Sequence, residues 1–434
     1  MKIFSYRYLP LNVYMGYSFL VVMSLLLGPI EYIGMDIATL LSFITVQLFL
    51  FSMGFLLGAR GEFRNAWRQV DERTISRHGS RWTLNILLLL GVVASLGQCV
   101  LFIYSGNDLS VGNIGQSYVE GYDGYERGEA PINALYIVKI LEQALVTLAL
   151  LFGFYYFRFL GAAGRWALIF VVVTYLLVNV VGTGKQKYLG DVVLYAFFCV
   201  LISFAAKGKR FTIKEILVAG ALSSGVFLIF VEILRQRYSA AGITLENIVE
   251  KAHPLISWDI GSPIFDLVGP EYGLAVGVFL GYFTNGLYGL YLSLTLPFEW
   301  TYLIGNSYSI GRMFEIFFSS DGYILEKTYP FRVGVTYGWG FDKWHSLFAW
   351  LASDVTFPGV LALSSLFGFV YARLWIQAVR GSNPFSGPLF LYLSLGLVFG
   401  YSNNQLMHSL AGVIVLVILF AGWLGSPNRR PQAQ

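Results

Sequence analysis

The sequence predicts an all-α integral membrane protein in which about ten helices cross the bilayer and one large loop lies on the outer side. Hydrophobic residues make up 56% of the 434 residues and charged residues only 12%, whereas soluble domains carry about 25% charged residues. Apolar stretches of about 20 residues, the length that a helix needs to cross the hydrocarbon layer, recur along most of the chain. We treat residues 1–434 as one polytopic domain.

These apolar stretches give the expected spans in chain order. The first stretch has no small-residue cleavage site before polar sequence begins, so we interpret it as a retained span and not as a signal peptide. The expected spans lie near 12–30, 37–58, 83–104, 133–157, 166–182, 190–206, 215–233, 354–377, 388–402 and 405–424.

The connections between the spans separate basic from acidic residues. The connections 59–82 and 207–214 and the tail 426–434 are rich in Arg and Lys, whereas the loop 105–132 is mostly acidic. Cytoplasmic connections carry an excess of Lys and Arg, so we assign the basic segments to the cytoplasm and the acidic loop to the outside. This orientation holds along the whole chain if about ten helices cross.

The uncharged segment 272–298 tests this count, because hydropathy alone would make it a further span. That crossing would move the basic tail to the outside and divide the candidate site between two compartments. The segment is also rich in glycine and tyrosine. We therefore expect a re-entrant or interfacial segment on the outer side, since irregular backbone at membrane depth is tolerated where protein encloses a cavity.

The stretch 234–353 is the large outer loop, and aromatic residues alternate there with charged ones. Aromatic rings can stack on the apolar faces of sugars while neighbouring polar groups bind the sugar hydroxyls, as in pockets with apolar walls and a few placed polar groups. An aromatic belt at the membrane interface is the alternative interpretation. The candidate glycan-binding residues are Tyr282, Trp300, Trp339 and Trp344.

Basic residues on the outer side run against the orientation rule and are candidates for binding an anion. Guanidinium groups bind phosphate oxygens in a bidentate manner, and the glycines within 182–187 would let the backbone approach an anion, although the spacing is not that of a Walker loop. Lysines that extend to lipid head groups are the alternative. The candidates are Lys185, Lys187, Arg235, Arg237 and Arg332.

His345 is the candidate proton acceptor, because it lies outside, near the membrane surface, and histidine titrates near neutral pH. Asp342 and Glu299 are the substitutes. His408 is expected inside the last spans and is set aside. Asp354 would either cap the start of the next span or take part in the chemistry.

Metal and cofactor chemistry is not expected. The sequence has no metal-ligand cluster, nucleophile elbow, dinucleotide fingerprint or nucleic-acid patch. Cys99 and Cys199 lie inside apolar runs, where a cysteine is usually a small buried hydrophobe.

On the features described above, the chain resembles the Wzy-type O-antigen polymerases of bacterial inner membranes and, in layout, the O-antigen ligases. The resemblance covers most of the chain as architecture. It rests locally on 180–185, on Arg235 and Arg237 at the start of the large loop, on 282–291, and on 344–346 followed by Asp354 and Gly359. A second large outer loop, frequent in the family, is missing, because the connection 182–189 is short.

The resemblance implies a GT-C-like fold and a metal-independent glycosyl transfer at the periplasmic face of the inner membrane. A hydroxyl of one lipid-linked repeat unit would attack the anomeric carbon of a glycan on undecaprenyl pyrophosphate, and the lipid pyrophosphate would leave. Arg235 and the other outer cations would neutralise the leaving group, and His345 would accept the proton, so Arg235 and His345 are the catalytic candidates. The expected partners are lipid-linked glycans, a chain-length regulator and a flippase of the same pathway, and no nucleic acid.

Two alternatives stay open. A ligase would transfer the glycan to lipid A core by the same chemistry. A transporter or flippase for lipid-linked sugars belongs to a different class, and such proteins usually show repeated halves and polar residues in mid-span. The sequence has no repeat and few charged residues in mid-span, with Lys139 and Glu142 as the exceptions. Sugar identity, linkage and polymer length are not encoded in any pattern that we recognise.

Overall fold

The structure is a computed structural model that describes residues 6–60, 81–104, 110, 114–119, 134–208, 212–320 and 322–426. Most of the basic connection 59–82, most of the acidic loop 105–132 and the tail from 427 onward lie outside these residues. Within them the fold is helical apart from one antiparallel pair, β1 (Ile30–Tyr32) and β2 (Ile256–Trp258). The expected all-α class is therefore confirmed.

The helices follow each other along the chain with short connections. They are α1 (Leu9–Leu27), α2 (Ile37–Ala59), α4 (Arg81–Tyr104), α6 (Ala134–Tyr155), α7 (Ala162–Leu176) continued by the π-helical turn η4 (Leu177–Val181), α8 (Lys187–Lys207), α9 (Ile213–Ala240), α10 (Ile248–Lys251), α11 (Pro263–Val268), α12 (Pro270–Leu294), α13 (Tyr308–Phe318), α14 (Tyr329–Tyr337), α15 (Leu347–Arg380), α16 (Ser386–Phe399) and α17 (Leu410–Gly425), with short 3-10 turns at η1 (Tyr6–Tyr8), η3 (Phe157–Phe159) and η5 (Leu325–Lys327).

Nine helices in the described part of the chain are long and apolar enough to cross a membrane. Eight of them correspond to expected spans, and α16 and α17, with 14 and 16 residues, are shorter apolar helices at the last two expected positions. The ninth is α12, which covers most of the segment 272–298 and ends at Leu294. The chain is therefore a polytopic membrane protein. Whether α12 crosses the membrane decides whether the N-terminus and the C-terminal tail lie on the same side.

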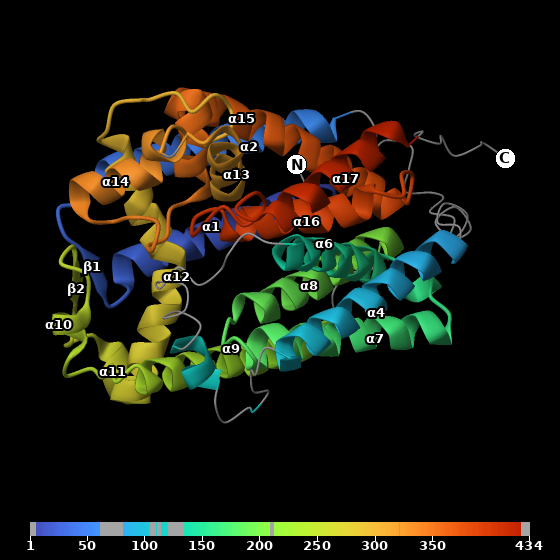
Figure 1. The fold of residues 1–434 in the computed structure, drawn as a ribbon, viewed down its shortest axis with the longest axis horizontal. Helices are drawn as coiled ribbons and strands as arrows, with labels where there is room; N and C mark the ends of the chain where they lie inside the picture. Colours follow the sequence, from blue (N-terminus) through green and yellow to red (C-terminus); the bar gives the residue numbers. More distant parts are fainter. Residues whose placement is uncertain are drawn as a thin grey trace.

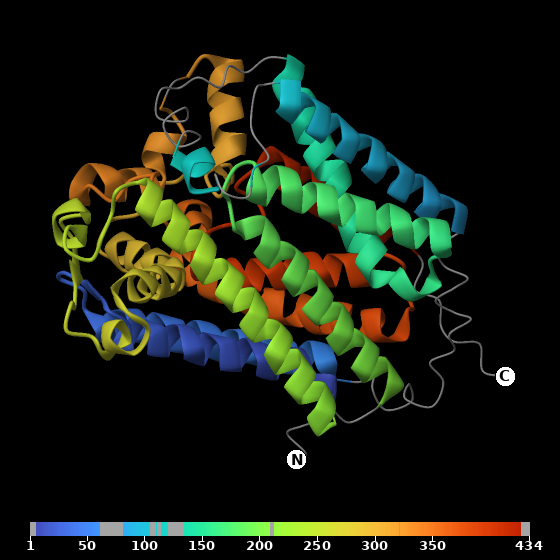
Figure 2. The ribbon, with the colours of Figure 1, turned by 90° about the horizontal axis from the view of Figure 1, so that it is seen from below.

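α12 runs across the direction of the other long helices. Figure 1 shows most helices lying along the long axis of the molecule and α12 running transversely from α11 towards α14, and Figure 2 shows it nearly end-on. It contacts α1, α9, α14 and α15, as expected of a helix laid across several others. Its direction agrees with an interfacial segment, although its length and composition would also allow a span.

The segment 272–298 is helical as far as Leu294, because α12 is one uninterrupted α-helix. Its glycines allow close packing. A Cβ atom on Gly286 would lie 2.1 Å from the carbonyl oxygen of Ser402, and one on Gly289 would lie 2.8 Å from that of Trp344. These two glycines therefore let the loops 400–409 and 338–346 lie directly against the helix.

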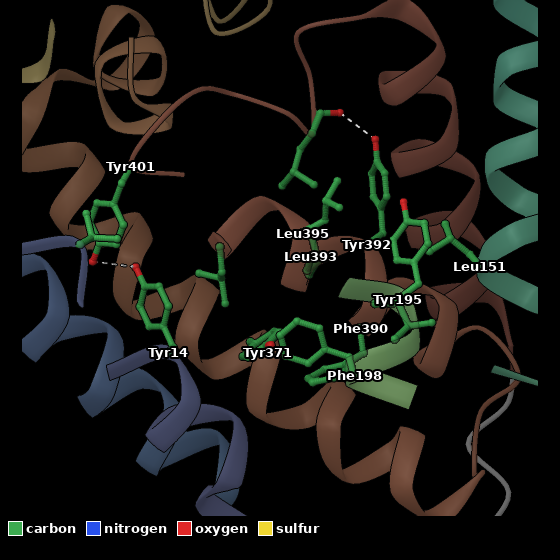
Figure 3. Close-up of a cluster of buried hydrophobic side chains, with 14 of the residues drawn as sticks. Tyr14, Leu151, Tyr195, Phe198, Tyr371, Phe390, Tyr392, Leu393, Leu395 and Tyr401 are labelled. Atoms are coloured by element: carbon green, nitrogen blue, oxygen red, sulfur yellow. Dashed lines mark hydrogen bonds between the residues drawn. The ribbon is translucent and has the colours of Figure 1, made fainter. Parts of the chain in front are cut away.

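The core is centred on α16. All of its residues from Ser386 to Leu397 are buried, as expected for a helix that is apolar on every side and surrounded by protein. Phe390 stacks on Tyr371 with ring centroids 4.7 Å apart. Figure 3 shows these rings beside Phe198, and it also shows the hydrogen bond between the hydroxyl groups of Tyr14 and Tyr401.

α16 is short for a span. Its 14 residues extend about 21 Å, which is less than the hydrocarbon thickness of about 30 Å. The loop 400–409 that follows it can therefore lie within membrane depth, where protein must surround its backbone. Its close contact with Gly286 provides part of that enclosure.

The expected eighth span, from residue 354, corresponds to the part of α15 that follows a kink, but the helical stretch begins earlier, at Leu347, where Ser346 caps it. The helix breaks at Thr356, which has φ 66°, two residues before Pro358. Asp354 therefore does not cap a helix start. Its carboxylate accepts hydrogen bonds from Thr301 and from the backbone of Gly305 and Asn306, and so fixes the loop after α12 to α15.

Basic residues gather at one end of the bundle, towards the lower right of Figure 2, where α1 and α9 begin and α2, α8 and α15 end. The described members of this group are Arg7, Arg60, Arg158, Arg165, Lys207, Lys214, Arg373 and Arg380. The opposite end carries the β1–β2 pair, α10, α11 and α14. This clustering of basic residues is the pattern from which the sequence-based orientation was inferred.

Candidate functional site

A cavity of about 490 Å³ opens between α8, α9, α12 and α16, at the end of the bundle opposite the basic cluster. Its chemistry changes along its depth. Lys187 starts α8, whereas Val193 and Leu194 lie about two turns deeper on the same helix, and Arg237 is near the end of α9, whereas Phe230 lies about two turns before it. The cavity is therefore cationic at its outer end and apolar below.

Arg237 is held in place by contacts with three side chains of this site. Its Nη1 donates hydrogen bonds of 2.9 Å to Gln186 Oε1 and to the hydroxyl of Tyr282, and its guanidinium carbon lies 3.3 Å from the centre of the Tyr118 ring. The side chain is buried, and its Nε has no hydrogen-bond partner within the described residues. A buried guanidinium without a carboxylate is costly, so its place is consistent with a site for an anionic ligand.

Lys185 and Lys187 stand on the other side of the same cavity end. Burial of the Lys185 ammonium among the cavity walls lowers its pKa, and the charges of Lys187 and Arg237 lower it further. In the part of the chain that the structure describes, no carboxylate lies within ion-pair distance of these three cations. The N-terminus of α8, which begins at Lys187, adds a partial positive charge.

Five of the candidate residues inferred from the sequence therefore meet in one cavity. They are Lys185, Lys187, Arg237, Tyr282 and Trp344. The rings of Tyr282 and Trp344 lie 5.0 Å apart, centroid to centroid, beside the cations. An aromatic pair next to cations can hold a sugar attached to a phosphate group.

Arg235 does not line this cavity, although it is two residues from Arg237. Its Nε and Nη2 donate to both carboxylate oxygens of Glu232, and its Nη1 donates to Glu271 at 3.1 Å. Two carboxylates thus share its charge, and the guanidinium also lies 5.6 Å from the Tyr272 ring centre. The prediction that Arg235 binds pyrophosphate and takes part in catalysis gains no support from this geometry.

Arg332 and Trp300 lie in another part of the outer end. Arg332 Nε is 3.0 Å from Glu299 Oε1, and its Nη1 donates to the carbonyl of Pro297. Trp300 is half exposed and packs on Tyr302, with centroids 4.9 Å apart. Neither residue lines the cationic cavity.

His345 and Trp339 lie behind the cavity wall that Trp344 forms. His345 is fully buried, its Nε2 donates to the carbonyl of Gly340 at 3.0 Å, and its Nδ1 has no partner within the described residues. Burial lowers the pKa of His345 to about 4, so the ring is neutral at pH 7. Trp339 is also buried and donates from Nε1 to the carbonyl of Trp344.

The base assignment for His345 therefore stays a prediction. Its neutral ring has a free acceptor nitrogen, but the ring is not among the residues that line the cavity. The two substitutes are also engaged, since Asp342 pairs with Lys343 at 2.7 Å and Glu299 pairs with Arg332.

The expected position of His408 inside the last spans is wrong. α17 begins at Leu410, and His408 lies in the loop 400–409, where it stacks on Tyr308 and meets the ring of Trp350 edge-on. Burial lowers its pKa to about 4, and the charge of Lys187 contributes in the same direction. The sequence-based span 405–424 was too long by about one turn, because Ser409 caps the helix.

Several polar residues of the cavity were not identified from the sequence. Tyr118 and Gln186 contact Arg237, and Asn403 and Gln405 line the cavity from the loop 400–409. Asn403 and Gln405 are uncharged residues between two apolar stretches, so only their polarity at that position could have drawn attention to them. Tyr118 lies in the acidic loop, which had no assigned role.

Comparisons with family models, curated proteins and solved structures found no match to this chain. Function must therefore be inferred from the site itself. Among the residues described, no group of three or more His, Cys, Asp or Glu side chains could hold a metal ion.

Proposed function

We propose that this chain is a membrane glycosyltransferase that joins undecaprenyl-pyrophosphate-linked repeat units into a surface polysaccharide at the periplasmic face of a bacterial inner membrane. The observation that carries the proposal is the cavity in which Lys185, Lys187 and Arg237 face the same space above apolar walls. A lipid with a doubly or triply charged head and a long hydrocarbon tail is the ligand class that complements both parts.

The head of such a lipid fits the cationic end. A pyrophosphate carries several negative charges, and three cations, none of which has a carboxylate partner among the described residues, supply matching charge within one cavity. Arg237 is already oriented by Gln186 and Tyr282, so little side-chain freedom is lost when the anion binds.

The tail of the lipid fits the deeper part of the cavity. Phe227, Phe230, Phe279 and Phe283 line it, and Ser223, Val226 and Phe227 come from α9, most of whose described residues are exposed on the outside of the bundle. A helix with so little burial faces lipid. An isoprenoid chain could therefore enter from the bilayer beside α9 while its head reaches Arg237.

The cations would assist the chemical step by stabilising the leaving group. When the acceptor hydroxyl attacks the anomeric carbon of the donor sugar, the bond from that carbon to the pyrophosphate oxygen breaks and negative charge develops on the pyrophosphate. Lys185, Lys187 and Arg237 are the residues that we assign to this charge. The Tyr282–Trp344 pair would hold the first sugar, and His345 remains the candidate that accepts the hydroxyl proton.

The proposal is tested by binding of undecaprenyl pyrophosphate to the purified protein in detergent. We expect tight binding that Arg237→Gln weakens strongly and Arg235→Gln does not, because only Arg237 lines the cavity. Equal affinity of the wild type and Arg237→Gln would contradict the assignment of the site.

The reaction is tested by deletion of the gene in the source strain and gel analysis of the surface glycan. Lipid A core that bears a single repeat unit supports the polymerase. Glycan that accumulates on the lipid carrier and is missing from core would indicate the ligase instead, and unchanged glycan would contradict both.

A further inference from the structure

A second pocket, of about 650 Å³, opens at the outer end of the molecule and shares no residue with the cationic cavity. Its polar lining consists mainly of Glu299, Ser320, Tyr323, Glu326, Lys327 and Arg332. The volume lies within the range of about 300–1,000 Å³ that is typical of ligand pockets. The second pocket and the cationic cavity differ in charge, and this difference indicates different ligands.

Among the described residues, the charges that line the second pocket balance. Two carboxylates, Glu299 and Glu326, stand with two cations, Lys327 and Arg332, and Arg332 is paired with Glu299 at 3.0 Å. A pyrophosphate would be repelled by the carboxylates and would have to break this ion pair. A sugar suits the pocket better, because its hydroxyl groups can donate to carboxylates and accept from the cations.

An aromatic platform stands at the edge of the pocket. Tyr323 lines it and stacks on Tyr302, with centroids 5.8 Å apart and planes 7° from parallel, and Lys327 Nζ lies 4.0 Å from the centre of the Tyr323 ring. Tyr302 and Tyr323 are both nearly half exposed, and Trp300 extends the row beside Tyr302. Exposed flat rings beside mixed charges are what a pyranose ring with several hydroxyl groups requires.

The backbone that carries this platform is strained and firmly held. Tyr302 and Leu303 have positive φ values of 56° and 65°, which cost energy for residues other than glycine. The buried carboxylate of Asp354 fixes the loop through Gly305 and Asn306. Ser320 Oγ, also at the pocket, is buried without a partner within the described residues, so a donor or acceptor is available to a ligand.

We propose that this second pocket binds sugar residues of the glycan at a distance from the pyrophosphate, so that the enzyme holds its polymer at two places. The identity of the glycan rests on the proposed function. In this assignment Arg332 and Trp300 belong to sugar binding, and Arg332 does not contact pyrophosphate.

The test uses glycan released from the surface polysaccharide of the source strain by mild acid, which carries no lipid and no phosphate. Binding to the full-length protein in detergent is measured by calorimetry. We expect Tyr323→Ala and Lys327→Met to weaken binding at least tenfold, and Val335→Trp, which fills the pocket from an exposed position, to do the same. Tyr104→Ala, on an exposed tyrosine at the end of α4, is the matched control and should bind as the wild type.

The proposed function and the proposal for the second pocket can be contradicted independently of each other. Arg237→Gln should leave binding of the free glycan unchanged and weaken binding of undecaprenyl pyrophosphate, whereas Tyr323→Ala should do the reverse. Absence of glycan binding by the wild type, or unchanged binding in Tyr323→Ala, Lys327→Met and Val335→Trp, overturns the second pocket as a sugar site. Absence of undecaprenyl pyrophosphate binding contradicts the proposed function instead.

Discussion

The guanidinium of Arg237 donates a 2.9 Å hydrogen bond to the side-chain oxygen of Gln186, across the gap between the end of α9 and the start of α8. This contact joins two segments that are 51 residues apart in the chain and orients the cation towards the cavity. A neutral amide orients the guanidinium without cancelling its charge, which a carboxylate would do.

Arg237→Gln should weaken binding of undecaprenyl pyrophosphate about 10- to 100-fold, because a hydrogen bond to a charged group contributes about 1.5–3 kcal/mol. Arg235→Gln is the matched control, on the same helix and already paired with Glu232 and Glu271. Calorimetric titration with the lipid in detergent measures both. A larger loss of affinity in Arg235→Gln than in Arg237→Gln would instead assign pyrophosphate binding to Arg235.

Gly289→Ala should destabilise the protein by about 1–3 kcal/mol, because the added methyl group would lie 2.8 Å from Trp344 O and 2.9 Å from His345 Nδ1. Gly220→Ala in α9 is the control, since nothing lies within 4 Å of its Cβ position. It should leave stability unchanged or raise it by up to about 1 kcal/mol. Thermal unfolding in detergent compares them, and equal melting temperatures would contradict the close packing of α12.

Stability should fall as the pH is lowered from about 6.5 to 4. His345 and His408 have folded-state pKa values of about 4 against an ordinary value of 6.5, so in this window the unfolded state binds protons that the folded state does not. Each histidine can remove about 3 kcal/mol over the whole window. Melting temperatures measured between pH 7.5 and 4.5 should show the slope, and His345→Gln should reduce it.

Asp354→Asn should loosen the loop 301–306, because an amide nitrogen replaces one of the two carboxylate oxygens and cannot accept the hydrogen bond that this oxygen takes from the backbone of Gly305 or of Asn306. We expect a loss of about 1–3 kcal/mol and weaker binding of free glycan at the second pocket. Asp342→Asn, on a half-exposed residue paired with its neighbour Lys343, should change stability by less than about 0.5 kcal/mol. Calorimetry measures the stability and the glycan binding, and limited proteolysis between residues 299 and 327 measures how far the loop is loosened.

Single cysteines should report the orientation once Cys99 and Cys199 are replaced by serine. A cysteine at Leu267, which is 81% exposed on α11, should react with a membrane-impermeant maleimide in intact cells. A cysteine at Lys214, at the start of α9, should react only after lysis. The opposite labelling pattern would show that the topology is reversed and that the proposed site does not face the periplasm.

The sequence determined the class of the protein and much of its order along the chain. Hydropathy located the long helices because a span must be apolar for about 20 residues, and this is a local property. The first turns of α15 were missed, since the helical stretch begins at Leu347 and the expected span begins at 354. Its first turns carry buried serine and aspartate that bind neighbouring loops, and hydropathy does not distinguish these from exposed polar residues.

Only the tertiary structure decided which candidates act together. The sequence marks Arg235 and Arg237 alike, but a helix turns about 200° over two residues, so one faces Glu232 and Glu271 and the other faces the cavity. Similarly, composition identified the aromatic and charged residues of 234–353 without showing that Trp344 joins Lys185 while Arg332 pairs with Glu299. These partners are far apart in the chain, and long-range packing, which no local pattern encodes, brings them together.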